Sequence, residues 1–229
     1  MKSVLALGVA ASTLAGASLI ATPASAAEYS LDTVSSLMMS TSQASSLGVA
    51  GNHIRDFQVL TGTKENPDDF WLCDLASGKQ VEVDGSSTVY VVAYTSAKSR
   101  VETVAGQELY SFATESDARK AMKEIRNAAA KCSATFTIDD EGLTFRQKLS
   151  NGRGTAPDGA GFTWIKSSAT ASGSTGALVE HEYNTFRRVG SFVQVVTLET
   201  AGSKAPKLTS SQIQRIDDLT GALGANWGW

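Results

Sequence analysis

Residues 115–131 carry the most regular hydrophobic pattern of the chain. Small and apolar side chains recur there at intervals of three and four residues, at Ala118, Ala121, Met122, Ile125, Ala128, Ala129 and Cys132. Charged side chains occupy the opposite face, and Thr114 with Asp117 forms a pattern typical of a helix N-terminus. This spacing predicts an amphipathic helix whose buried stripe ends at Cys132.

Cys73 and Cys132 are the two cysteines of the chain. In an oxidising compartment an isolated pair of cysteines most simply forms a disulfide. The bond would close the long loop between the two residues and, by restricting the unfolded chain, would stabilise the folded state by on the order of 4 kcal/mol. A metal site or a catalytic thiol would need a histidine or a second cysteine at ligand spacing, and neither cysteine has one. We therefore expect a structural bridge that fastens the helix to the strand containing Trp71, and no metal site.

Most of the remaining sequence alternates strand-like runs with turns. These runs lie at 56–60, 69–75, 88–94, 107–112, 135–139, 143–149, 162–167, 178–188 and 191–200. Helical spacing appears again over 30–47, where Met38 is interpreted as core filling, and from Thr209, with Gly224 as the C-cap. The order predicts an α+β fold: an antiparallel or mixed β-sheet with helices packed mainly on one face, and one disulfide.

The first 26 residues have the pattern of a secretory signal peptide. Lys2 precedes a diluted apolar run, and small residues follow it up to the predicted cleavage point between Ala26 and Ala27. The alternative is an uncleaved membrane anchor, but Ala, Ser, Thr and Gly weaken the run and no basic cluster follows it. We expect a signal peptide at 1–26, one secreted domain at 27–229, and no stable membrane anchor after cleavage.

The charge of the mature chain argues against a nucleic-acid partner. After residue 26 the chain has 19 basic and 23 acidic residues, and its basic residues form no cluster longer than a pair. Proteins that bind nucleic acid carry a concentrated basic surface. Nucleic-acid binding is therefore excluded from the expected functions, and the sequence has no cofactor-binding motif.

Two segments are similar to a known family. Residues 109–114 lead into the predicted helix that ends at Cys132, and residues 186–193 combine two arginines, a Gly-Ser turn and an apolar strand. Both resemble the PknH-like extracellular sensor domain of actinobacterial membrane kinases, lipoproteins and secreted proteins, over residues 30–224. The resemblance implies a mixed α+β fold with a cleft for an unknown extracellular ligand.

Two further segments have alternative interpretations. Residues 150–161 are rich in glycine, and their backbone amides with Arg153 could hold an anion, but a long flexible hairpin connection is the simpler interpretation. His181 lies between Glu180 and Glu182 in a strand, so both carboxylates face away from it. We interpret His181 as either a surface histidine or one with satisfied hydrogen bonds, and we predict no catalytic residues.

Aromatic residues give the best binding hypothesis. The candidate ligand-binding residues are Trp71, Phe162, Trp164 and Arg187. Core packing is the alternative for Trp71 and Trp164, and Trp227 and Trp229 either dock back on the domain or present an adhesive end.

Together these features predict a secreted, non-enzymatic ligand-binding domain of the sensor type, acting at the bacterial cell envelope. Its partner would be an unknown small molecule or a cell-envelope ligand. A secreted hydrolase without a recognisable motif and an envelope protein-interaction module remain alternatives.

Overall fold

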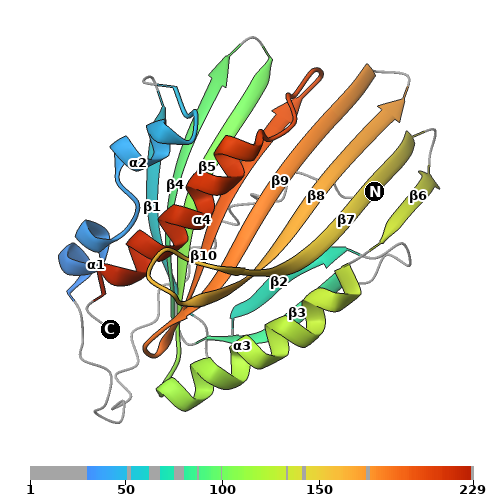
Figure 1. The fold of residues 1–229 in the computed structure, drawn as a ribbon. Helices are drawn as coiled ribbons and strands as arrows, with labels where there is room; N and C mark the ends of the chain where they lie inside the picture. Colours follow the sequence, from blue (N-terminus) through green and yellow to red (C-terminus); the bar gives the residue numbers. More distant parts are fainter. Residues whose placement is uncertain are drawn as a thin grey trace, which may run out of the picture.

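Figure 1 shows the computed structural model of the chain. The structure describes residues 30–50, 53–61, 68–74, 80–86, 88–98, 100–132, 134–140, 143–173 and 176–227. The predicted signal peptide, its cleavage point at Ala26 and Ala27, and Trp229 lie outside these residues.

The described part of the chain is built on an eight-stranded antiparallel sheet (Figure 1). In spatial order its strands are β1 (Ile54–Thr61), β4 (Thr88–Lys98), β5 (Val101–Ser111), β10 (Phe192–Gly202), β9 (Gly176–Val189), β8 (Gly161–Gly173), β7 (Leu143–Thr155) and β6 (Thr135–Asp140). The last strand of the sequence, β10, therefore lies between β5 and β9 in the middle of the sheet. A separate two-stranded ribbon consists of β2 (Asp68–Asp74) and β3 (Gln80–Ser86).

One face of the sheet, here called the α4 face, is covered by α1 (Leu31–Leu37), α2 (Thr41–Ser46) and α4 (Ser210–Ala225) (Figure 1). Helix α4 packs against β9 and β10, and Thr209 with Gln212 forms its predicted capping box. Ile216 and Leu223 of α4 are fully buried against apolar side chains of the sheet.

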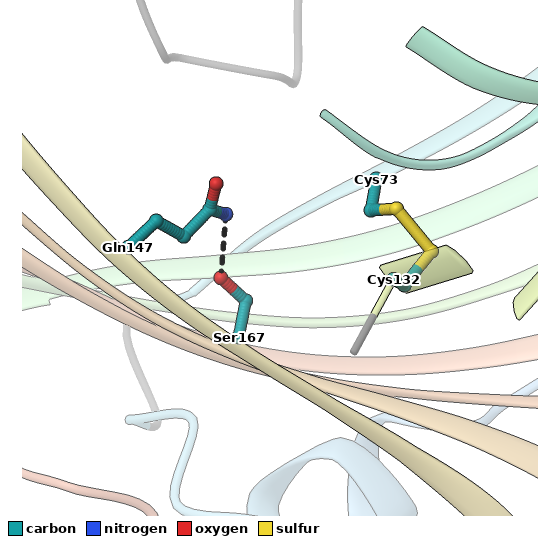
Figure 2. Close-up of a disulfide and its surroundings, with 4 residues drawn as sticks. All are labelled: Cys73, Cys132, Gln147 and Ser167. Atoms are coloured by element: carbon teal, nitrogen blue, oxygen red, sulfur yellow. Dashed lines mark hydrogen bonds between the residues drawn. A yellow bond between two sulfur atoms is a disulfide. The ribbon is translucent and has the colours of Figure 1, made fainter. Parts of the chain in front are cut away.

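The opposite face, here called the α3 face, is partly covered by α3 (Glu115–Ala129) and the β2–β3 ribbon. The apolar stripe of α3 is buried as its spacing predicts, and Thr114 caps the helix by accepting a hydrogen bond from the Asp117 backbone. The predicted disulfide is confirmed: Cys73 of β2 is bonded to Cys132, with the two Cα atoms 5.9 Å apart (Figure 2).

Each face of the sheet has its own hydrophobic core, because successive side chains along a strand point to opposite faces. In β10, Phe192, Val196 and Leu198 pack on the α4 face, while Val193 and Val195 pack on the α3 face. The predicted fold class is therefore confirmed: the sheet is antiparallel, and α1, α2 and α4 share one face.

Two predicted helix boundaries were wrong, and one strand was missed. The helix expected over 30–47 is two helices, because Ser40 leaves the helical conformation and caps α2 together with Gln43. Helix α4 continues through Gly224 to Ala225, and Asn226 is its C-cap. The strand β3 was not predicted at all, although Val81 and Val83 are buried in it. The interpretation of Met38 as a core residue is confirmed, since it is 3% exposed.

Candidate functional site

The two halves of the α3 face have different surfaces. Beneath α3 and the β2–β3 ribbon the sheet presents large apolar side chains, including Ile165, Phe186 and Val195. Farther along the same strands the side chains become acidic, polar or small. We call the group formed by Glu108, Glu180, Glu182 and Glu199 the carboxylate patch.

Strand register brings the patch together. Glu199 of β10 lies directly opposite Glu182 of β9, and Glu180 precedes Glu182 by two residues in the same strand. Glu108 of β5 pairs with Val195 of β10, whose side chain shares the α3 face with Glu199. Carboxylates from three neighbouring strands are therefore held on one face of the sheet.

The electrostatics of the patch are unfavourable for ionised carboxylates. Burial raises the pKa of Glu199 to about 8, and the negative charges of Glu182, Glu180 and Glu102 contribute to this shift. Burial, with the neighbouring Glu182, raises the pKa of Glu180 to about 7. Like charges placed directly opposite each other destabilise a sheet. Near neutral pH the patch therefore carries protons as well as negative charge.

The other two carboxylates are partly satisfied by hydrogen bonds. Burial raises the pKa of Glu182, although Asn184 Nδ2 donates to its Oε1 over 2.9 Å. Burial also raises the pKa of Glu108, against a 2.6 Å hydrogen bond from the Tyr110 hydroxyl. Among the described residues, no patch carboxylate forms an ion pair.

Two buried amide oxygens on the same face lack a donor. Asn184 is 6% exposed and Gln147 is 8% exposed, and neither Oδ1 of the first nor Oε1 of the second accepts a hydrogen bond within the described chain. Gln147 Nε2 donates to Ser167 Oγ over 2.9 Å, and its oxygen points away from that contact (Figure 2). Buried amide oxygens are normally paired, so these two indicate a place where a partner is missing.

The four predicted ligand-binding residues do not converge on one place. Trp71 lies in β2, which belongs to the layer on the α3 face. Phe162, Trp164 and Arg187 lie on the α4 face, where Trp164 pairs with Thr185 and packs against Tyr183 with ring centroids 6.0 Å apart. A binding role for these residues stays a prediction.

Arg187 is held by the protein itself. It is 6% exposed, its Nη2 forms a 2.5 Å ion pair with Asp158, and its Nη1 donates to the carbonyl oxygens of Thr220 and Gly221. Burial opposes ionisation of Asp158, but the Ala160 N–H and Arg187 outweigh it and lower the pKa of that carboxyl. A Cβ on Gly224 would lie 2.7 Å from Arg187 Cζ, which explains why a glycine occurs inside α4.

The glycine-rich segment is mostly strand rather than loop. Strand β7 continues to Thr155, and a short turn follows before β8 begins at Gly161. A Cβ on Gly152 would lie 2.4 Å from the Trp164 ring, and one on Gly154 would lie 2.2 Å from the Phe162 ring. The long flexible connection predicted here was wrong, because these glycines make room for aromatic rings on the neighbouring strand.

His181 is buried on the α4 face, and its Nδ1 lies 2.9 Å from Ser168 Oγ. Burial, with Lys207 and Lys166, lowers its pKa. Glu180 and Glu182 lie on the opposite face, as the alternation in the sequence predicts. Of the two alternatives for His181, a surface histidine or one with satisfied hydrogen bonds, the structure shows the second.

Trp227 docks back on the domain, one of the two alternatives for the C-terminal aromatics. It is 4% exposed and its ring centroid lies 5.5 Å from that of Phe192.

Sequence reasoning missed the carboxylate patch. Glu180 and Glu182 were considered only as partners of His181, and Glu108 and Glu199 drew no attention. The available signal was acidic residues at same-face positions of long strands otherwise rich in apolar residues. Joining those strands into one site required knowing that β10 lies between β5 and β9.

Comparison with known proteins supports the fold. No protein-family model matches the chain, and no curated protein does. Among solved structures it resembles the extracellular domain of PknH from Mycobacterium tuberculosis, with 13% identity, a TM-score of 0.50, and coverage of 83% of this chain and 94% of that one. No helix in the described ranges is long and apolar enough to cross a membrane. The two chains share a fold, which agrees with the resemblance found in the sequence.

Proposed function

We propose that this protein is a non-enzymatic ligand-binding domain of the sensor type that acts outside the cytosol, and that its binding site is the carboxylate patch. The Cys73–Cys132 disulfide and the fold shared with an extracellular domain support the location. The observation that carries the binding site is the Asn184 side chain, which is buried beside Glu182 with its Oδ1 unpaired.

A ligand would complete this part of the sheet. Opposed carboxylates and unpaired amide oxygens cost stability, and proteins tolerate such features mainly at functional sites. The half of the α3 face beneath α3 is closed by apolar packing and by the disulfide, and among the described residues the buried group there that lacks a partner is the Thr163 hydroxyl rather than a set of carboxylates and amides.

The test is a native mass spectrum of the protein purified from the culture medium of its own host. We expect an excess mass that disappears on denaturation, and we expect the double variant Glu182→Gln, Glu199→Gln to lose it. Glu82→Gln, an exposed position on β3, is the matched control and should keep the excess. Equal native and denatured masses, with no thermal shift from charged, polar or apolar small molecules, would contradict the proposal.

A second candidate, a hydrolase, is favoured by the contact between Ser168 and His181. A serine nucleophile needs a neighbouring base, and that base is usually oriented by a third group. The nearest glutamates in sequence, Glu180 and Glu182, face the other side of the sheet. An ester hydrolase activity that is lost in Ser168→Ala and retained in Ser167→Ala would establish this function instead.

A further inference from the structure

We infer that the carboxylate patch binds a small organic cation with two or more amino groups. This inference rests on the proposed function and names the chemical class of its ligand. It follows from the charge of the patch, from the spacing of its carboxylates and from the unpaired oxygens beside them.

The charges that act on the patch have one sign. The groups that shift the pKa values of its four carboxylates electrostatically are other acids, with Glu102 of β5 added to the patch itself. The basic side chains of the neighbouring strand positions point to the α4 face. Ser167 and Ala97 lie on the α3 face, so the adjacent Lys166 and Lys98 lie on the α4 face, because successive side chains of a strand point to opposite faces. Asp56 of β1 extends the acidic character of the α3 face, because it pairs with Ala93 of β4.

Two basic residues of the sheet, Arg188 of β9 and Arg153 of β7, do share this face, and both lie toward the end of their strands that is farther from the patch. Arg188 lies at the other end of β9, and its Nη1 is 3.6 Å from Glu115 of α3. Helix α3 thus presents an acid toward that end of the strand. The positive charge that the patch lacks has to come from a ligand.

The spacing of the carboxylates favours an organic cation over a metal ion. Within the described residues, no three His, Cys, Asp or Glu side chains lie close enough to hold a metal. Neighbouring strands are about 4.8 Å apart, so the carboxylates of β5, β10 and β9 are spread over roughly 10 Å. Separate ammonium groups on one flexible molecule match this spread, whereas a single ion does not.

The unpaired oxygens fit the same ligand. An ammonium group has three N–H donors and no acceptor, so it can bind a carboxylate and an amide oxygen together. Asn184 Oδ1 lies beside Glu182, and Gln147 lies in the same row of the sheet as Glu180, with Ala169 between them. The side chains between the carboxylates are short, including those of Gly106, Thr197 and Ala201. An alkyl chain can therefore lie against β10 between the charged groups.

Binding of such a cation must release protons. Glu180 and Glu199 have pKa values near 7 and 8 in the free protein, and a bound ammonium would lower both. The ionised patch is the binding form, so affinity rises between pH 6 and pH 8.5 and levels off above the higher pKa.

The experiment is calorimetric titration of the exported protein with putrescine, cadaverine and spermidine at pH 6, 7 and 8.5. Each titration is repeated in two buffers with different ionisation enthalpies, which reports the protons released. We expect binding that is about tenfold tighter at pH 8.5 than at pH 6, with proton release at pH 7. The diol 1,6-hexanediol is the uncharged control, and magnesium chloride is the test for a metal ion.

Variants connect the binding to the patch. Glu182→Gln and Glu199→Gln each remove one charge without changing shape, and each should weaken amine binding by about tenfold or more. Glu82→Gln should bind as the parent protein does. Because relief of like-charge repulsion should raise the melting temperature of Glu199→Gln, loss of binding in that variant cannot be ascribed to unfolding.

Four outcomes would overturn the inference: no heat with any of the three amines, equal binding of the diol, binding of magnesium in place of the amines, or unchanged affinity in both patch variants. If the natively purified protein nevertheless carries an excess mass that the double patch variant loses, the proposed function stands and only the ligand class is wrong. If neither an excess mass nor amine binding is found, both proposals fail.

Discussion

Arg187 and the carboxylate patch lie on opposite faces of the central part of the sheet, where β9 carries Arg187 and two of the patch glutamates, and their charges have different surroundings. Both terminal nitrogens of Arg187 have partners within the chain, an acid and two carbonyl oxygens. The patch carboxylates face one another, and they have no ion-pair partner among the described residues. A charge whose partners are built into the fold is a structural element. A group of charges left without them indicates a site that an external partner completes.

The largest expected effect on stability is at Arg187, whose charge has its partners within the chain. Arg187→Met should lower the free energy of unfolding by about 3–5 kcal/mol, because it removes a buried guanidinium and leaves the two buried carbonyl oxygens that it binds, together with the partly exposed Asp158, without a donor. Urea denaturation at pH 7 measures this. Arg188→Met is the control, since Arg188 is one-third exposed and should cost less than about 1 kcal/mol. A similar loss in both variants would remove the distinction between the two arginines.

The next effect concerns the surroundings of Arg187. Gly154→Ala should cost roughly 2 kcal/mol, because the new methyl group would displace the buried Phe162 ring. Gly159→Ala, at a turn position with φ of +83° and open space around it, is the control for backbone strain alone. A cost in Gly154→Ala no larger than that of the control would show that the ring moves freely.

Substitutions in the carboxylate patch should raise the free energy of unfolding, whereas substitutions around Arg187 should lower it. Glu182→Gln with Glu199→Gln should stabilise the free protein by about 1 kcal/mol at pH 8.5 and by much less at pH 5. The sign follows from the raised pKa values. The folded state holds more protons than the unfolded state between about pH 4.5 and pH 8, so stability of the parent protein falls as pH rises through this range. Urea denaturation at both pH values measures it, and destabilisation at pH 8.5 would show that the carboxylates are paired after all.

The smallest effect is expected at Asp158. Its side chain is 33% exposed, so solvent screening limits the gain from its ion pair, and Asp158→Asn should cost about 0.5 kcal/mol at pH 7. Because the pKa of Asp158 is lowered, this contribution is complete above the unfolded value near 3.8 and is lost as pH falls through the folded one. A difference between parent and variant that persists at pH 2.5 would contradict this assignment.

The fold was more accessible from the sequence than the candidate site, for a physical reason. Helix α3, the strand alternation and the pairing of Cys73 with Cys132 depend on local spacing and on there being two cysteines. The passage of α4 through Gly224 depends on its contact with the distant Arg187, of which local propensity gives no warning. The helix break before α2 is different, because the capping box of Ser40 and Gln43 is a local signal that the sequence interpretation did not use.

The candidate site depends almost entirely on distant pairing. Glu108 comes close to Glu182 and Glu199 only because β10 lies between β5 and β9, which come from different parts of the chain. The aromatic hypothesis selected residues by type, and three of the four lie on the α4 face, away from the unpaired polar groups. A residue type indicates what chemistry is available, but strand order decides which residues meet.

The central position of β10 also governs how the chain can be assembled as it is made. The hairpin of β4 and β5 and the meander of β6, β7, β8 and β9 are complete before β10 exists, yet they become one sheet only through it. Until then β5 and β9 each present an open edge, which is the surface on which incomplete chains aggregate. A chain that stops before Phe192 therefore has two separate sheets, and what connects them is α3, the β2–β3 ribbon and the Cys73–Cys132 disulfide.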